Sequence, residues 1–384
     1  MRILFVGLQY IHTSRWINQL KDSRHEIYLF DCLDKPIHED LKWTNYITNW
    51  SKRKVRYIKG EHFFNKKFPR IYKIIEPNLQ ITSSEKLIEI IKNIKPDIVH
   101  SLEMQAETYP ILKAYKKLKF KWVYSCWGND IFYFSKIKKH KNKINNCVKN
   151  IDYFFLECER DKKLIRSISD RGIILGTSFP GGGGYDLQLY EKFYRNNSQR
   201  KLILIKGYEH LFGRALNILN ALELIINDIK DFDIYVYSAH DKVIEKIIQM
   251  NKKYNLNIEY SSRYKQIKHI ELLKKFGEAK ISIGNNISDG VPNTLLEGLI
   301  SGAFPIQSNP GGASEDFIKD GKNGFLINDP NNIINIADLI SKALSNRDLV
   351  KSAAIENKII SKRLDYLMIK GKVLEAYNKI EIEL

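Results

Sequence analysis

The sequence has few of the features that mark secreted, membrane-spanning or zinc-binding proteins. Its four cysteines form no C-x-x-C pair, and no histidine cluster joins them at zinc spacing. Four cysteines in 384 residues make no disulfide framework, so we expect reduced thiols in a cytoplasmic protein. The apolar opening at 2–6 is too short for a signal peptide. No apolar run approaches the roughly 18 residues of a membrane span, so we expect no transmembrane helix.

Acidic residues are scarce in the first half of the chain, which makes the charge asymmetric. Residues 1–180 carry 34 Lys and Arg against 19 Asp and Glu, whereas residues 181–384 carry 28 against 25. A genome-wide lysine bias would load both halves alike, so the asymmetry suggests a polyanionic partner for the first half. The interleaved basic and aromatic residues of 52–73, with the lysine run 113–121, suit an anionic membrane surface or a lipid diphosphate. A lysine-rich face that is merely solvated is the alternative.

The chain alternates strand and helix patterns in two series, which is typical of two parallel α/β domains. We expect strands at 2–6, 26–30, 97–100, 121–125, 153–157 and 173–175, then at 202–205, 233–237, 257–260, 279–283, 303–306 and 324–327. We expect helices at 12–21, 85–96, 107–118, 136–149 and 160–168, then at 214–228, 241–253, 267–277, 293–301 and 333–345, with a helical tail from about 351. The region 50–75 is the least regular.

Pro180 and the four glycines that follow it are hard to place inside a helix or strand. They therefore predict the junction between two Rossmann-like domains, at 1–180 and 185–365.

The segment 289–297 (DGVPNTLLE) follows a predicted strand and enters a predicted helix. Gly290 lets the backbone approach a ligand closely. The helix that begins near Asn293 directs unpaired N–H groups and a positive dipole end at the same point, which favours a diphosphate. Glu297, about one turn into the helix, is well placed to accept hydroxyl protons from a ribose. An ordinary helix start with a surface acid is the other interpretation.

This segment resembles the paired-acid motif of the family 4 retaining glycosyltransferases, in which two acids stand eight positions apart. Five other segments also match that family: 302–306 (GAFPI), 311–315 (GGASE), 320–326 (DGKNGFL), 12–16 (HTSRW) and 25–27 (HEI). The resemblance spans nearly the whole chain. It implies the GT-B fold, with two Rossmann-like domains facing a central cleft and a C-terminal helix, about 366–384, that crosses back to the first domain.

The resemblance implies which residues of the second domain bind the donor. Glu297 would hold the nucleotide ribose, and Asp289 and the amides after Gly290 would contact the donor sugar. The expected donor-binding segment comprises Gly290, Val291, Pro292, Asn293, Thr294 and Glu297. Asp289 stands where the family usually has Glu, so we expect a different sugar or shifted contacts. Pro292 replaces a usual glycine and removes one amide donor.

The family also places a basic pair against the donor diphosphate, after the first strand of the second domain. Lys206 and Arg214 are the candidates here, since cations stabilise the charge that develops on the leaving diphosphate. A solvated cation at a helix start is the alternative for either residue.

In the first domain the resemblance places Gly7 on a loop that faces the donor diphosphate. It makes His12 and Asp130, together with Asp289 of the second domain, the candidate catalytic residues. His100, at the expected end of a strand, is a further candidate.

These features predict a retaining hexosyltransferase whose first domain binds the acceptor and whose second binds a UDP-, GDP- or other nucleotide sugar. The acceptor is expected to be a glycan or a polyprenyl-diphosphate-linked glycan of bacterial surface polysaccharide biosynthesis, at the inner face of the plasma membrane. No cofactor or metal is expected, since no Asp-x-Asp motif stands where a metal would be needed. A non-hydrolysing sugar-nucleotide 2-epimerase can share this architecture. A basic nucleic-acid-binding protein is the other alternative, although no motif for it is present.

Overall fold

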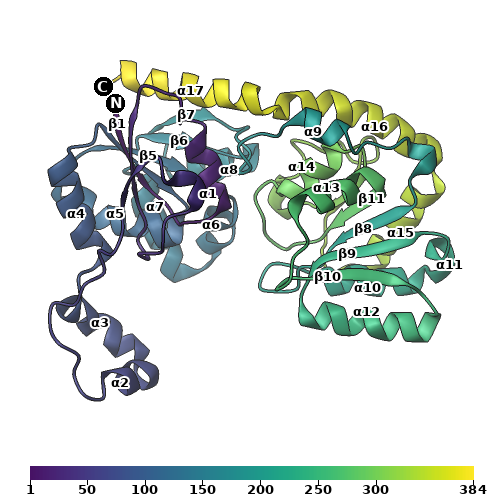
Figure 1. Ribbon diagram of the computed structural model, residues 1–384, viewed down its shortest axis with the longest axis horizontal. Helices are drawn as coiled ribbons and strands as arrows, with labels where there is room; N and C mark the ends of the chain where they lie inside the picture. Colours follow the sequence, from purple (N-terminus) through teal and green to yellow (C-terminus); the bar gives the residue numbers. More distant parts are fainter. The chain divides into compact units, whose positions relative to one another are not determined.

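The structure, a computed structural model, describes all residues from 1 to 384 and divides them into two compact units. Unit 1 comprises residues 1–156, 162–177 and 372–384, and unit 2 comprises residues 157–161 and 178–371. Each unit is built on one parallel sheet with helices on both faces (Figure 1). The expected α/β class with two Rossmann-like domains is therefore confirmed. No helix is both long and apolar enough to cross a bilayer.

Unit 1 has a seven-stranded sheet in the order β3-β2-β1-β4-β5-β6-β7. Its strands are β1 (Arg2–Val6), β2 (Glu26–Phe30), β3 (Asn45–Ile47), β4 (Ile98–Leu102), β5 (Lys121–Ser125), β6 (Tyr153–Phe155) and β7 (Ile173–Gly176). Its helices are α1 (Ile11–Asn18), α2 (Glu61–Lys67), α3 (Pro69–Leu79), α4 (Ser83–Ile94), α5 (Tyr109–Lys117), α6 (Asn129–Phe132) and α7 (Lys138–Val148). Helix α8 (Glu159–Ile168) begins in unit 2 and continues in unit 1. The strand order reverses at β1, and open α/β sheets bind ligands at the carboxyl ends of strands beside such a point.

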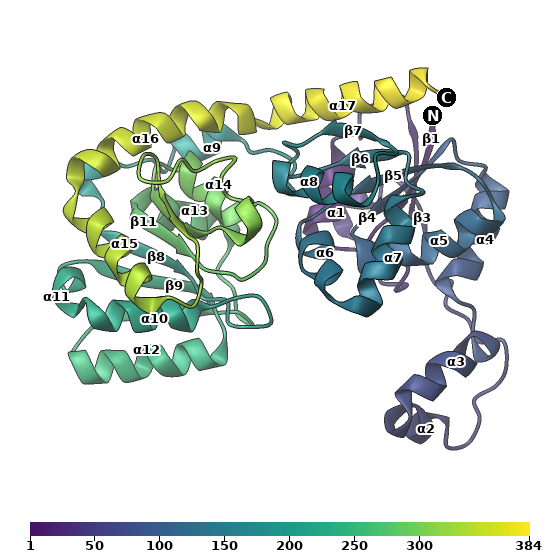
Figure 2. The ribbon, with the colours of Figure 1, turned by 180° about the vertical axis from the view of Figure 1, so that it is seen from behind.

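Unit 2 has a six-stranded sheet in the order β10-β9-β8-β11-β12-β13, which reverses at β8 (Figure 2). Its strands are β8 (Leu202–Lys206), β9 (Asp233–Ala239), β10 (Ile258–Ser262), β11 (Ala279–Gly284), β12 (Phe304–Ser308) and β13 (Phe325–Ile327). Its helices are α9 (Leu187–Glu191), α10 (Ala215–Leu224), α11 (Ile226–Ile229), α12 (Asp241–Tyr254), α13 (His269–Glu278), α14 (Asn293–Ile300), α15 (Ile333–Ser345) and α16 (Arg347–Ser361). The last helix, α17 (Tyr366–Ile382), begins in unit 2, and its residues from Lys372 belong to unit 1.

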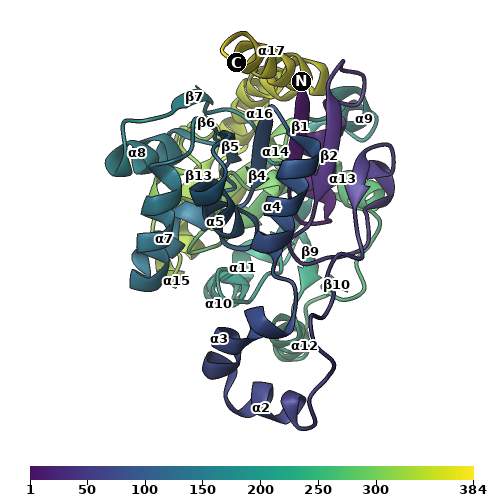
Figure 3. The ribbon, with the colours of Figure 1, turned by 90° about the vertical axis from the view of Figure 1, so that its left-hand side faces the viewer.

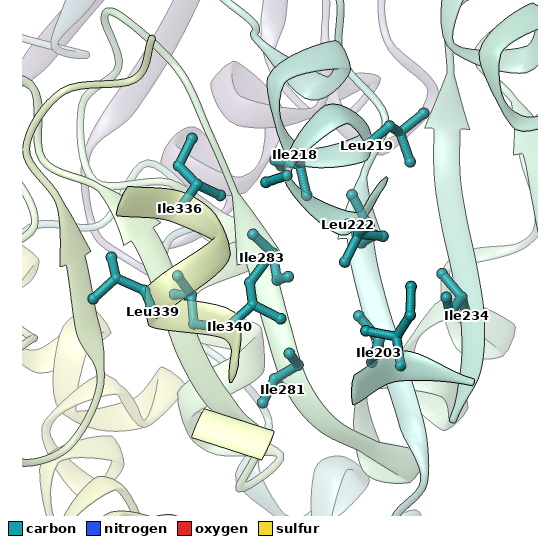
Figure 4. Close-up of a cluster of buried hydrophobic side chains, with 14 of the residues drawn as sticks. Ile203, Ile218, Leu219, Leu222, Ile234, Ile281, Ile283, Ile336, Leu339 and Ile340 are labelled. Atoms are coloured by element: carbon teal, nitrogen blue, oxygen red, sulfur yellow. The ribbon is translucent and has the colours of Figure 1, made fainter. Parts of the chain in front are cut away.

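The central strands of both sheets are largely apolar runs because each sheet is covered on both faces. In unit 2, Ile203 of β8 and Ile281 of β11 lie with the inward faces of α10 and α15 in one buried cluster (Figure 4). Those helices contribute residues at spacings of three and four, among them Ile218 with Leu222 and Ile336 with Ile340. This packing fixes the ends of β8 and β11, from which the loops of the candidate site extend.

The region 50–75 was expected to be the least regular part of the chain; residues 50–60 contain no helix or strand, but the rest is largely helical. It folds into α2 and most of α3, and these two helices extend away from the sheet of unit 1 (Figure 3). Pro69 at the first turn of α3 is a helix-start signal. Hydrophobic periodicity did not predict these two helices, because their apolar residues do not form a buried stripe. Only Tyr72 is buried.

The glycine run 181–184 lies inside unit 2, which takes up the chain at Ser178. The run is packed closely: a Cβ at Gly182 would lie 2.8 Å from the Asn293 side chain. Gly184 has φ +88° and backs onto Tyr366. Glycine is thus required here by close approach within unit 2.

Candidate functional site

The loop 285–292 joins β11 to α14 and carries the acidic motif. Its shape is fixed from within: the Asn286 amide donates to Asp289 Oδ2 at 2.9 Å, and the Asn286 backbone N–H donates to Ser308 Oγ at 2.9 Å. Helix α14 then begins at Asn293 with no side chain capping its N-terminus. Helix starts without a side-chain cap leave their dipole end available to an anionic ligand. The structure therefore agrees with the expected strand–loop–helix context.

The first amide after Gly290, that of Val291, was expected to contact the donor sugar and is already bonded inside the protein, as is the N–H of Gly290 itself. The Gly290 N–H donates to Asp289 Oδ1 at 3.0 Å, and the Val291 N–H donates to Glu157 Oε2 at 3.2 Å. The other Glu157 oxygen accepts from the Gly181 N–H at 3.0 Å, which ties residues 157–161 to unit 2. Pro292 has no N–H. That the amides after Gly290 contact the donor sugar stays a prediction, and in this structure the Val291 N–H is bonded to Glu157.

Glu297 lies on α14 with its side chain 5% exposed. Its Oε1 lies 2.7 Å from Nε2 of His269, the first residue of α13, whose side chain is half exposed. Because a carboxylate only accepts, the ring N–H of His269 donates to Glu297 Oε1 and so orients a carboxylate that can accept hydroxyl protons from a ribose. His269 was missed from the sequence because it stands 28 positions away, in another helix.

Lys206 ends β8 and was predicted as a diphosphate ligand. Its Nζ lies 3.8 Å from Asp289 Oδ2 and 4.7 Å from the ring centroid of Tyr208. The structure thus brings together Lys206 and Asp289, which stand 83 positions apart in the chain. Asp289 is a quarter exposed, so this carboxylate remains open to solvent.

Arg214, the other predicted diphosphate ligand, faces its own loop. Its Nη1 donates to the carbonyl oxygens of Gly213 at 2.7 Å and of His210 at 3.1 Å. It therefore shapes the loop 207–213. Gly213 is required there, because a Cβ would lie 2.2 Å from the Tyr208 carbonyl oxygen. In this arrangement Arg214 is bonded to its own loop, so it does not form with Lys206 the predicted pair of diphosphate ligands.

A different set of basic side chains gathers at the same edge of the sheet, which we call the cation cluster: Lys206, His210, His240 and Arg263. Arg263 follows β10, and its guanidinium lies 5.0 Å from the Tyr208 ring centroid. The rings of His210 and His240 lie 5.5 Å apart. Since the members end or follow the neighbouring parallel strands β8, β9 and β10, the carboxyl-end rule applied to all strands would have found His240 and Arg263.

Electrostatics within the cation cluster favour an anion. Burial lowers the pKa of His210, and the neighbouring His240 and Lys206 lower it further. Asp289 acts in the opposite direction but more weakly. A bound phosphate would offset this repulsion, so the cluster has the charge expected of an anion-binding site.

In unit 1 the structure places Gly7 and His12 at the end of β1. The Gly7 N–H donates to the Phe30 carbonyl at 3.0 Å, and a Cβ at Gly7 would lie 3.1 Å from the Leu102 and Thr13 side chains. His12, in the first turn of α1, has its ring 6.1 Å from that of Trp127. The structure therefore brings His12 together with Trp127 of the loop after β5.

Asp130 is buried and its carboxylate serves the loop that carries it. It accepts from the Tyr124 hydroxyl, from Cys126 Sγ at 3.3 Å and from the backbone N–H groups of Trp127 and Ile131. A carboxylate engaged by these four donors positions the loop, and direct contact with substrate hydroxyls does not follow from this geometry.

His100 does not end a strand; it lies in the middle of β4 and is fully buried. Its Nδ1 lies 2.6 Å from the hydroxyl of Tyr377, and its Nε2 lies 2.9 Å from Ser125 Oγ. Burial lowers the pKa of His100 to about 3. The expected site role for His100 is therefore wrong, because the imidazole is neutral and packed in the core.

Three acidic residues, Asp31, Glu103 and Glu107, lie together near the ends of β2 and β4, and they were not identified from the sequence. Burial raises the pKa of Glu107 to about 8 and that of Glu103 to about 7, and it also raises the pKa of Asp31. Glu107 is fully buried; its Oε2 accepts from the Cys32 N–H at 3.2 Å, and its Oε1 has no partner. All four cysteines are buried, and none forms a disulfide.

Comparisons with known proteins agree with this architecture. Residues 2–157 match the family described as glycosyl transferase 4-like, and residues 238–359 match the family described as glycosyl transferases group 1. A search of curated protein sequences gave no match.

Solved structures match over the full length. Sucrose-phosphate synthase from Thermosynechococcus elongatus is 12% identical, with 100% of both chains covered and a TM-score of 0.68. HepE from Anabaena, in complex with UDP and glucose, is 11% identical, with 99% of this chain and 100% of that chain covered and a TM-score of 0.68. A glycosyltransferase from Rickettsia africae is 17% identical, with 99% and 98% covered and a TM-score of 0.65. The two family matches and the shared GT-B fold establish that this chain belongs to the group 1, family 4-like glycosyltransferases.

Proposed function

We propose that the protein is a retaining hexosyltransferase that moves a sugar from a nucleotide-sugar donor to a glycan or a polyprenyl-diphosphate-linked acceptor, in bacterial surface polysaccharide biosynthesis. The observation that carries the donor assignment is the neighbourhood of Glu297 in unit 2. Its carboxylate with His269 is suited to a ribose, and the cation cluster at the same sheet edge is suited to a diphosphate. The similar HepE structure contains UDP-glucose, which supports testing uridine donors first.

Each group has a role in the proposed transfer. Breaking the glycosidic bond leaves negative charge on the diphosphate, and Lys206 and Arg263 stabilise that charge without a metal ion. Glu297 holds the ribose by accepting its hydroxyl protons. Asp289, 3.8 Å from the Lys206 ammonium, is in position to accept from a sugar hydroxyl. Unit 1 binds the acceptor, near His12 at the end of β1.

The proposed place of the reaction is the cytoplasmic face of the membrane, where a lipid-linked acceptor is held. The support is the charge of the first half of the chain, which carries 34 Lys and Arg against 19 Asp and Glu over residues 1–180. Basic surfaces bind the anionic headgroups of that leaflet.

Donor binding is tested by thermal unfolding with UDP, GDP, ADP and their sugars. One nucleotide class is expected to raise the unfolding temperature of the native protein and to lose that effect in Glu297→Ala. His269→Ala should lose part of it. The control is Glu271→Ala, which removes a half-exposed carboxylate from α13 and should bind the nucleotide normally. A nucleotide that stabilises Glu297→Ala as well as the native protein contradicts the ribose assignment.

The reaction itself is tested by product analysis. With the selected donor and an acceptor, the product should keep the anomeric configuration of the donor sugar, and EDTA should leave the rate unchanged. Release of a free epimer without any acceptor would instead identify a 2-epimerase.

A further inference from the structure

Residues 52–80 of unit 1 form an arm that stands apart from the rest of the unit. The arm comprises α2, α3 and the segment that precedes them, and it extends away from the sheet in all three ribbon views (Figures 1–3). No residue of α2 is buried, and Tyr72 is the one buried residue of α3. The arm therefore contributes almost nothing to the core of unit 1.

The arm is held in shape by polar groups. Arg53 donates to both carboxylate oxygens of Glu61, at 2.7 and 2.8 Å, and the Tyr72 hydroxyl donates to the same carboxylate at 2.7 Å. These donors lower the pKa of Glu61 to about 2. At its base, the Ile81 N–H donates to the Lys52 carbonyl at 2.9 Å. The arm is thus structured without using its large apolar side chains as a core.

Those apolar side chains face solvent instead. Eight of the 26 large apolar side chains that are exposed in the whole chain fall within residues 55–75. They are Val55, Tyr57, Ile58, Phe63, Phe68, Ile71, Ile74 and Ile75. In α3 the three isoleucines recur at spacings of three and four and so share one face. A concentration of this kind marks an interaction surface, because scattered exposure is the ordinary case.

The charge of the arm selects the kind of partner. Residues 52–80 contain nine Lys and Arg against two Glu. Lys67 Nζ lies 5.6 Å from the ring centroids of both Phe63 and Phe68, so cationic and apolar groups are interleaved. Two copies of such a surface repel each other because both are positively charged. A soluble polyanion would neutralise the charge but would leave the isoleucines exposed to water. An anionic bilayer meets both properties, with apolar groups at the acyl boundary and ammonium groups among the phosphates.

We propose that this arm docks the protein on an anionic lipid bilayer. The isoleucine face of α3, with Phe63 and Phe68, enters the interface. The lysines and arginine around it contact headgroup phosphates: Lys66, Lys67, Arg70 and Lys73. This inference names the element that carries the membrane part of the proposed function, and it does not depend on which sugar is transferred.

Insertion is tested with a fluorophore on the arm. Because all four native cysteines are buried, an environment-sensitive dye attached to Ile74→Cys reports one position. Vesicles of phosphatidylcholine with about one third phosphatidylglycerol should shift its emission to the blue, and pure phosphatidylcholine vesicles should do so much less. The control is Ile359→Cys on α16, which is 64% exposed and should show no shift.

Binding is tested by co-sedimentation of the full chain with the same vesicles. Phe63→Ser with Ile74→Ser should lower the partition coefficient at least tenfold, whereas Ile355→Ser with Ile359→Ser, two exposed isoleucines of α16, should not. Lys66→Gln with Lys73→Gln should lower it about five-fold per charge. The matched charge control is Lys242→Gln with Lys252→Gln on α12.

Three results would overturn the proposal. One is equal binding by the arm variants and their controls. Another is a blue shift that needs no vesicles and grows with protein concentration, which indicates a second copy. The third is heparin binding that matches vesicle binding and survives the serine substitutions. Nucleotide stabilisation measured on the same variants should be unchanged, so failure of docking and failure of the donor assignment are distinguishable.

Discussion

Replacing Glu107 by Gln should change the pH dependence of stability of unit 1. In the folded protein the carboxyl is fully buried with Oε1 unpartnered, and burial raises its pKa from 4.5 to about 8. Between these values the folded state holds a proton that the unfolded state has released, so stability falls as pH rises through the window. A pKa raised this far lowers the free energy of unfolding by up to about 5 kcal/mol once pH exceeds 8.

The variant removes this titration. Neutral Gln has nearly the shape of protonated Glu, so the two proteins should be similarly stable at pH 5. At pH 9 the variant should be more stable by about 2–5 kcal/mol. Urea unfolding followed by tryptophan fluorescence measures unit 1 alone, because all five tryptophans lie in it. Glu89→Gln, which removes an exposed carboxylate, is the control and should keep the native pH profile. A difference between Glu107→Gln and the native protein that is the same at pH 5 and pH 9 would refute the reasoning.

Three further outcomes are expected in unit 2. Arg263→Ala should weaken binding of a nucleoside diphosphate about tenfold or more in calorimetry while leaving a nucleoside unaffected, and equal losses for both would remove Arg263 from the diphosphate site. Gly213→Ala, whose Cβ would lie 2.2 Å from the Tyr208 carbonyl oxygen, should abolish nucleotide stabilisation while circular dichroism stays native. Arg200→Ala should destabilise unit 2 by about 3 kcal/mol or more, because three carbonyls lose their donor; hydrogen exchange confined to unit 2 measures this, and unchanged protection contradicts it.

Most of the fold could be predicted because its elements follow local rules. Buried strands of a parallel sheet are continuous apolar runs, and the helices between them bury a stripe with the period of the helix. Helix α15 was predicted with its observed bounds, 333–345, since its buried residues keep that period without interruption. The arm escaped prediction for the opposite reason: its helices bury one side chain, so no inward stripe exists to be recognised.

The candidate site divides in a similar way. Lys206 was identified because it ends a recognisable strand, and Glu297 because it lies about one turn into the helix that the acidic motif enters. His269 was not, since only the folding of distant segments brings it beside Glu297. Arg263 was overlooked although it directly follows β10, a predicted strand. The bonds that occupy the amides of Gly290 and Val291 could not be foreseen either, because Glu157 comes from a segment 134 positions away.

The last helix has a consequence for the order in which the protein is made. Tyr377 is fully buried in unit 1, where its hydroxyl accepts from Trp16 Nε1 at 3.3 Å and lies 2.6 Å from His100. Residues 372–384 leave the ribosome after all of unit 2. Until then, unit 1 lacks Tyr377, and the space beside His100 in its core stays unfilled. Unit 2 therefore has the opportunity to fold first, and a nascent chain stalled before Lys372 should hold unit 1 open to proteases and chaperones.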